Sequence, residues 1–203
     1  MFLSTVDYYT ENAAQLSGRY LSRSAQLVHG DWFAAVCAKQ ASGRACDVGA
    51  GSGRDALWLA SHGWSVVAVE PSAGMRDLAM RENSGQIHWV DDCLPDLAVL
   101  SLLPDRFDLI LVSAVWQHLA PASRASAMRA LGNLLLPQGN LVITLRHGSD
   151  DAENTLRGFF GVSAQQLEEQ ALVAGLAPVL CRCRDDDARA HIQWESCVFT
   201  RPV

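Results

Sequence analysis

The chain has 203 residues, of which 49% are hydrophobic and 19% are charged, and its formal net charge is −6 at pH 7. This length and composition predict a single globular domain with a sizeable core and exclude an intrinsically disordered chain. The acidic balance, with arginines scattered along the sequence, argues against nucleic-acid and anionic-membrane partners, because both bind clustered basic residues.

The first 40 residues are expected to form a helical lid over a core that spans residues 41–203 of the same domain. From Arg44 onward, short β-branched runs alternate with segments of helical periodicity. The expected strands are Arg44–Gly49, Ser65–Glu70, Gln86–Val90, Phe107–Ser113, Asn140–Arg146, Ala177–Cys183 and Trp194–Thr200. The expected helices between them are Arg54–His62, Ala73–Glu82, Leu97–Leu103 and Ala122–Leu136. Such alternation predicts a parallel sheet with helices on both faces.

The end of the chain departs from this alternation. Ser163 is expected to cap a helix that runs to about Ala174. The last two strands are joined only by Arg184–Gln193, which is too short for a crossover helix and predicts an antiparallel hairpin. The three aspartates at positions 185–187 are expected to lie in a solvated turn. The predicted fold is therefore a doubly wound α/β fold, with a seven-stranded, mostly parallel sheet and a C-terminal antiparallel hairpin.

The segment ACDVGAGSGRDALWLA, residues 45–60, carries the strongest functional signal. An apolar strand ends near Asp47, and Gly49, Gly51 and Gly53 follow in a turn before a helix that begins near Arg54. Glycines let the backbone turn sharply and approach a ligand, and the start of a helix adds partial positive charge. The spacing is GxGxG, whereas the dinucleotide fingerprint GxGxxG needs a glycine at the position of Arg54.

Glu70 provides a second signal at the end of the next strand, 17 residues after Gly53. A carboxylate at this position can accept hydrogen bonds from both hydroxyls of a ribose. Taken alone, an acid after a strand is more often a helix cap or a surface charge. Together with the glycine turn at this distance, Glu70 favours a nucleoside-containing ligand.

The sequence DVGAGSGRDALWLA…GWSVVAVEPSAGM resembles the class I S-adenosylmethionine (SAM) dependent methyltransferases, and the resemblance extends over most of residues 45–200. It implies SAM as the cofactor and the same seven-stranded fold. It also implies a cofactor-binding role for the strand-end acid, the glycine turn, the residue after it and the ribose acid. These residues are Asp47, Gly49, Gly51, Gly53, Arg54 and Glu70.

Two further segments match the family pattern. In IHWVDDCLP, the resemblance places the adenine edge beside Asp92 and Cys93, with Asp91 as the alternative acid. In FDLILVSAVWQHLAP, it places Ser113 beneath the methionine part of the cofactor. The pair Arg54-Asp55 is similar to the subset that contains tellurite and other small-molecule methyltransferases.

Several residues are candidates for the acceptor side. His118 follows the fourth strand and could act as a general base or cap the next helix, and Trp116 could line the pocket or pack in the core. Arg146 and His147 end the fifth strand, where Arg146 could hold an acidic substrate or pair with a structural carboxylate. In the N-terminal segment Tyr9 is chosen to face the sulfonium, with its neighbours Tyr8 and Tyr20 as alternatives, because an aromatic face attracts a cation.

These features predict a methyltransferase that acts on a small-molecule acceptor. The alternatives are a SAM-binding regulatory module without turnover, a protein or RNA methyltransferase, and a nicotinamide-dependent oxidoreductase. No membrane-spanning segment, signal peptide or metal site is expected, which predicts a cytoplasmic protein. Six cysteines are interpreted as reduced core thiols. They are Cys37, Cys46, Cys93, Cys181, Cys183 and Cys197.

Overall fold

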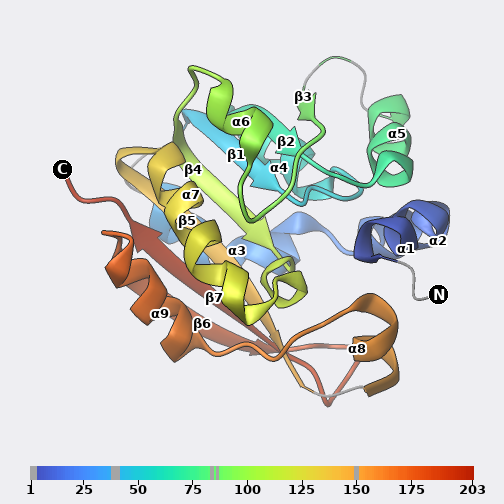
Figure 1. The fold of residues 1–203 in the computed structure, drawn as a ribbon. Helices are drawn as coiled ribbons and strands as arrows, with labels where there is room; N and C mark the ends of the chain where they lie inside the picture. Colours follow the sequence, from blue (N-terminus) through green and yellow to red (C-terminus); the bar gives the residue numbers. More distant parts are fainter. Residues whose placement is uncertain (1–3, 38–41, 83–84, 86, 149–150) are drawn as a thin grey trace.

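The computed structural model describes residues 4–37, 42–82, 85, 87–148 and 151–203, and its strands form one seven-stranded sheet (Figure 1). The strand order is β3-β2-β1-β4-β5-β7-β6. The strands are β1 (Arg44–Val48), β2 (Ser65–Val69), β3 (Ile87–Val90), β4 (Phe107–Ser113), β5 (Leu135–His147), β6 (Ala177–Asp185) and β7 (Gln193–Thr200). The first five strands are parallel, and β7 runs antiparallel to both β5 and β6. The predicted fold class is confirmed.

Helices cover both faces of this sheet. The α-helices are α1 (Thr5–Glu11), α2 (Ala13–Leu21), α3 (Ala25–Cys37), α4 (Arg54–Ser61), α5 (Ala73–Glu82), α6 (Ala98–Leu102), α7 (Arg124–Leu134), α8 (Asp151–Arg157) and α9 (Ala164–Val173). Two short 3-10 turns, η1 (Trp116–His118) and η2 (Pro121–Ser123), follow β4. None of the helices in the described ranges is long and apolar enough to cross a membrane.

The apolar run of β4 shows why the sheet is covered on both sides. Ile110 and Val112 pack into the cluster on one face, with residues of α6, α7 and α9. Leu109 and Leu111 pack into the cluster on the other face, with residues of α3 and α4. Successive side chains of a strand point to opposite faces, so a continuous apolar run needs two cores.

The boundary between α7 and β5 differs from the prediction. The helix ends at Leu134, and β5 begins at Leu135, before the predicted start at Asn140. Pro137 lacks the N–H that would continue a helix. The backbone N–H of Gln138 instead donates to the carbonyl of Arg201 at 2.7 Å, and Gln138 is part of β5. Gln86, the first residue of the predicted third strand, lies outside the described residues.

The N-terminal helices divide into two groups. In Figure 1, α1 and α2 lie beside α5, against which Ala13 and Leu16 pack around the fully buried Met75. In contrast, α3 belongs to the core, where Trp32 is fully buried among residues of α4 and the sheet. The lid over residues 1–40 stays a prediction, and α3 also contributes to the core.

Two predictions about the C-terminal hairpin are also wrong. Cys181 and Cys197 occupy directly paired positions of β6 and β7 and form a disulfide, and Cys183 is an exposed thiol. They are not reduced core thiols. Asp186 does not lie in a solvated turn, because it is 5% exposed and accepts hydrogen bonds from the Trp194 indole and the Arg189 guanidinium.

Candidate cofactor and acceptor site

A cavity of about 620 Å³ lies at the carboxyl ends of the parallel strands. Its floor comes from the segments that follow β1, β2, β3 and β4. Its wall includes residues of α1, α2, α3, β5, the end of α8 and the β6–β7 connection. In doubly wound sheets, ligands bind in the crevice outside these strand ends. The cavity is therefore the candidate site.

The glycine turn forms part of the cavity floor. Gly49, Gly51 and Gly53 have φ angles of 75°, 53° and 76°, which lie in the left-handed region that favours glycine. A Cβ atom at Gly49 would clash with the Val115 side chain. Gly49 and Gly51 line the cavity. Gly53 lies behind the described lining, where a Cβ atom would press against the Trp89 ring at 3.2 Å.

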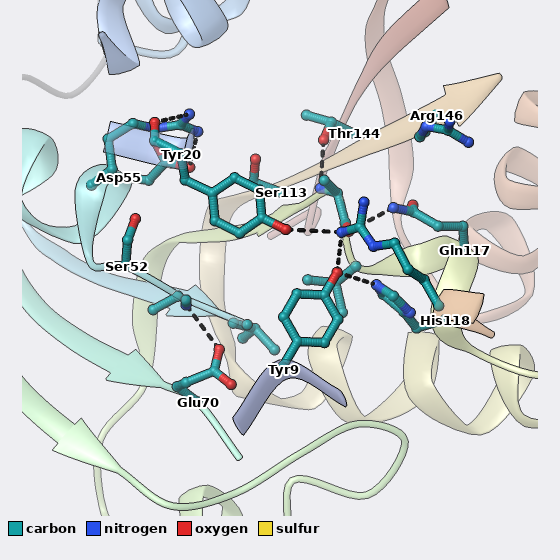
Figure 2. A pocket seen from close by; sticks show the side chains of 18 of the residues that line it. Tyr9, Tyr20, Ser52, Asp55, Glu70, Ser113, Gln117, His118, Thr144 and Arg146 are labelled. Carbon is teal, nitrogen blue, oxygen red and sulfur yellow. Dashed lines mark hydrogen bonds and ion pairs between the residues drawn. The ribbon is translucent and has the colours of Figure 1, made fainter. Parts of the chain in front are cut away.

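Glu70 reaches the cavity from the end of β2 and is 7% exposed. Its Oε2 accepts a hydrogen bond from the Gly51 N–H, and its Oε1 accepts one from the Ser72 N–H, both at 2.8 Å. Figure 2 shows the carboxylate together with the first of these bonds. Burial raises the pKa of this carboxyl, and the two N–H donors oppose the rise. The bonds fix the carboxylate while leaving each oxygen a second lone pair for a ligand hydroxyl.

Asp47 and Arg54 have different surroundings. Asp47 is 1% exposed and lies behind the described lining, where burial raises the pKa of its carboxyl well above the usual value. Arg54 lines the cavity and donates two hydrogen bonds to Asp55, at 2.6 and 2.9 Å. His29 contacts the same Asp55 carboxylate at 3.0 Å. Asp47 is thus a buried carboxyl outside the described lining, and Arg54 is a candidate ligand contact.

The structure distinguishes the two acids after β3. Asp92 and Cys93 line the cavity, whereas the Asp91 carboxylate pairs with Arg76 at 2.9 Å and is absent from the described lining. Asp92 also accepts a hydrogen bond from the Leu100 N–H of α6 at 2.8 Å, which fixes its position. Cavity geometry therefore favours Asp92 over Asp91.

Ser113 lines the cavity at the end of β4. The next residue, Ala114, has a φ of 57° and donates its N–H to the Thr144 hydroxyl on β5 at 2.8 Å. This hydrogen bond stabilises the turn at Ala114, because alanine rarely adopts a positive φ without outside support.

A network of polar side chains occupies the other end of the cavity. Figure 2 shows the hydroxyls of Tyr9 and Tyr20 directed toward a common point beside His118. The Arg157 guanidinium donates to both hydroxyls, at 2.8 Å to Tyr20. His118 Nε2 lies 3.2 Å from the Tyr9 hydroxyl. Because that hydroxyl accepts from Arg157, its own proton is available to His118 Nε2.

His118 lines the cavity, but its protonation is unfavourable. Burial and, to a smaller extent, the positive charge of Arg157 together lower the pKa of its imidazole to about 4. The Nδ1 atom is buried and has no hydrogen-bond partner in the described part of the chain. At neutral pH the imidazole is therefore neutral, and its Nε2 shares a hydrogen bond with the Tyr9 hydroxyl.

The other predicted acceptor residues separate into three positions. Arg146 lines the cavity and pairs with Glu153 of α8 at 2.6 Å. His147 pairs with Glu195 at 2.8 Å and lines only a smaller recess of about 150 Å³ next to the cavity. Trp116 is 1% exposed in the core, because η1 turns it inward. The substrate-contact predictions for His147 and Trp116 are wrong.

The sequence interpretation missed Arg157 and Phe159, which both line the cavity. They lie in TLRGFFG, at the end of a helix of seven residues that is too short to give a periodic signal. The run of aromatic residues beside an arginine was the available signal.

Residues 46–143 match the family model described as a methyltransferase domain. An uncharacterized methyltransferase from Staphylococcus carnosus is 29% identical over 109 residues, which make up 52% of this chain and 48% of that protein. The match thus spans about half the length of this relative.

Solved structures with a similar fold cover nearly the whole chain. N-methyltransferase NodS from Bradyrhizobium japonicum, in complex with S-adenosyl-l-homocysteine (SAH), has a TM-score of 0.78 at 17% identity, covering 99% of this chain and 100% of that one. Magnesium protoporphyrin IX methyltransferase from Synechocystis, with bound SAH, has a TM-score of 0.74 at 15% identity, covering 96% of each chain. The 1,6-didemethyltoxoflavin-N1-methyltransferase from Burkholderia thailandensis has a TM-score of 0.65 at 20% identity, covering 95% and 90%. At these identities the likeness establishes the fold.

The seven-stranded sheet with its terminal hairpin, and the cavity at the strand ends, define a class I Rossmann-like fold. Residues 46–143 therefore resemble a methyltransferase domain, and the chain has the fold of the solved methyltransferases named above.

Proposed function

We propose that this protein transfers the methyl group of SAM to a small-molecule acceptor in the 620 Å³ cavity. The observation that carries the proposal is the Glu70 carboxylate, fixed by the N–H groups of Gly51 and Ser72 at the cavity wall. This arrangement fits a ribose, whose two hydroxyls need acceptors at a fixed position. The SAH bound in the similar NodS structure supports the same cofactor.

The remaining cofactor contacts follow from the cavity lining. Asp92 and Cys93 would meet the adenine edge, and Ser113 lies where the methionine part would pass. SAM supplies a methyl group on a positively charged sulfur, so a nucleophile displaces a neutral thioether. The protein's own contribution is to align the two reactants and keep water away.

The size of the cavity supports a small acceptor. Its volume of about 620 Å³ is within the range of roughly 300–1,000 Å³ that small-molecule sites have. Two of the similar structures are named for small-molecule substrates, a magnesium porphyrin and a toxoflavin precursor. A net charge of −6 also disfavours a nucleic-acid acceptor.

The contacts of His118 support a positioning role rather than the general-base role expected from the sequence. An imidazole with a pKa of about 4 is a weak base at neutral pH, and its Nε2 is already hydrogen-bonded to the Tyr9 hydroxyl. We infer that His118 and Arg157 orient the Tyr9 hydroxyl at the acceptor end of the cavity. His118→Gln keeps an acceptor for that hydroxyl, so it should retain more turnover than His118→Leu at equal SAM affinity.

Binding and transfer are tested in sequence. Calorimetry should show micromolar binding of SAM and SAH and much weaker binding of NAD, and tighter NAD binding would indicate an oxidoreductase instead. Methyl-labelled SAM is then incubated with the small-molecule, protein and RNA fractions of a cell extract. We expect label in the small-molecule fraction. Label in protein or RNA would contradict the acceptor class, and binding without transfer to any fraction would identify a regulatory SAM-binding module.

We also propose a cytoplasmic location and a single catalytic domain in which α1 and α2 form the lid. The free thiols of Cys37 and Cys46 support a reducing compartment, whereas the bond between Cys181 and Cys197 opposes it. Cell fractionation distinguishes a cytoplasmic location from an oxidising compartment.

A further inference from the structure

Three residues of types that bind metal ions gather on one face of the C-terminal hairpin. Cys181 of β6 is directly paired with Cys197 of β7. Glu195 lies two residues before Cys197, so its side chain projects from the same face of β7. One donor atom of each residue, the two sulfurs and a carboxylate oxygen, lies within 4.8 Å of the others. No metal site is predicted from the sequence, because the register of β6 against β7 is what brings these residues together.

The Glu195 carboxylate is held with one oxygen toward the sulfurs. Its Oε2 lies 2.8 Å from Nε2 of His147 on β5, and its Oε1 lies 3.4 Å from Cys181 Sγ. The side chain of Glu195 is only 16% exposed. A disulfide sulfur carries no proton, so the bonded cysteine pair gives Oε1 no hydrogen bond. The position of this oxygen is better explained by a ligand that the carboxylate and the two sulfurs share.

The spacing of these donor atoms suits a zinc ion. Zinc binds thiolate sulfur at about 2.3 Å and carboxylate oxygen at about 2.0–2.2 Å, so two ligand atoms of one ion lie up to about 4.6 Å apart. The separations in the hairpin, all within 4.8 Å, reach this span with small side-chain rotations once the two sulfurs are no longer bonded. Cys197 is 3% exposed, whereas Cys181 is exposed. A metal ion can therefore enter from solvent on the side of Cys181.

We propose that the reduced hairpin binds Zn²⁺ through the thiolates of Cys181 and Cys197 and the carboxylate of Glu195, with water as the fourth ligand. The disulfide is the metal-free form of the same cysteine pair. A thiol or phosphine reductant supplies the two electrons that open the sulfur–sulfur bond to two thiols, and Zn²⁺ displaces the two thiol protons as it binds. The three ligands are absent from the described lining of the 620 Å³ cavity, so the site is separate from the proposed methyl transfer.

Metal titration of the full-length protein tests the proposal. The protein is reduced with a phosphine, the phosphine is removed without air, and Zn²⁺ is titrated in competition with a chromophoric chelator. We expect one Zn²⁺ to bind per reduced chain, and the oxidised protein to bind it at least tenfold more weakly. Cd²⁺ in place of Zn²⁺ should produce an ultraviolet thiolate-to-metal charge-transfer band, which reports ligation by sulfur. Zn²⁺ should also raise the unfolding temperature of the reduced protein.

Variants assign the metal to the three residues. Cys181→Ser and Glu195→Gln should each weaken Zn²⁺ binding by the reduced protein tenfold or more. Neither residue is buried, so these changes leave the core intact. Cys183→Ser is the matched control, because Cys183 is an exposed free thiol on the same strand but lies outside the group of three. Its Zn²⁺ affinity should stay within twofold of the parent.

The proposal is overturned if the reduced parent binds no stoichiometric Zn²⁺, or if the oxidised protein binds it equally well. Unchanged affinity in both Cys181→Ser and Glu195→Gln also overturns it, because the metal ion would then be bound elsewhere. A loss in Cys183→Ser as large as that in Cys181→Ser would show that the set of three ligands is wrong.

Discussion

Protonation of His118 should destabilise the folded protein in weak acid. The imidazole has a pKa of about 4 in the folded state, held down first by burial and then by the charge of Arg157. An unfolded histidine has a pKa of about 6.5. Between these values the unfolded chain binds a proton that the folded chain does not, so the free energy of unfolding falls as the pH falls.

The size of this effect follows from the two pKa values. From about pH 7 to about pH 5, the difference in proton binding lowers the free energy of unfolding by about 2 kcal/mol. The neutral imidazole makes its full contribution to stability above the pKa of the unfolded histidine. That contribution is completely lost only below the pKa of the folded histidine. Other groups titrate over the same range, among them Glu70 with its raised pKa, so the effect must be isolated by a variant.

His118→Gln provides that isolation, because glutamine can accept the Tyr9 hydroxyl proton but does not titrate. Urea unfolding of the parent and of the variant is measured at pH 7 and at pH 5. The parent should lose about 2 kcal/mol more than the variant over this interval. Equal losses would show that His118 has an ordinary pKa in the folded state, and the reasoning about its neutral, hydrogen-bonded form would then be refuted.

Two further positions give direct tests of the cofactor half. Glu70→Gln should weaken SAM binding by about 1.5–3 kcal/mol in calorimetry, since it removes a charged acceptor, and the exposed Glu82→Gln should leave binding unchanged. Lowering the pH should protonate Glu70 and weaken SAM binding by the parent. Because the pKa of Glu70 is raised, this loss of affinity should begin at a pH above the usual range for a carboxyl group. Glu70→Gln should make SAM affinity less dependent on pH. Gly49→Ala should destabilise the fold by about 2 kcal/mol or more in thermal or urea unfolding, because its φ is 75° and the new Cβ meets Val115. Gly18→Ala, in a helix with no atom within 4 Å of the new Cβ, is the control and should be neutral or stabilising.

The sheet could be predicted because its signals are local. The bounds of β4 and α5 agree with the predicted Phe107–Ser113 and Ala73–Glu82. An apolar run and a capped amphipathic segment can each be recognised from a few neighbouring residues. The glycine turn and Glu70 were found for the same reason, as their spacing is fixed by one strand–helix–strand unit.

Predictions failed where burial depends on distant partners. Asp186 is one of three successive aspartates, and only its contacts with Trp194 and Arg189 make it the buried one. Cys181 and Cys197 are 16 residues apart, and the register of β6 against β7 brings them together. Trp116 and His118 share one short turn, yet one side chain points to the core and the other to the cavity. Periodicity carries no information about such a turn.

The two halves of the cavity therefore differ in how their sequence specifies them. The predicted cofactor contacts come from consecutive strand ends within the segment that matches the family model. The acceptor wall joins opposite ends of the chain, since Arg157 bonds Tyr9 and Tyr20 across 148 and 137 residues. A change at Tyr9, Tyr20 or Arg157 thus alters the acceptor wall directly, whereas Glu70 and the glycine turn are set by the strand ends. Such a division lets one cofactor site serve different acceptors, and it explains why the donor follows from the sequence while the acceptor must be inferred from the side chains that the fold assembles.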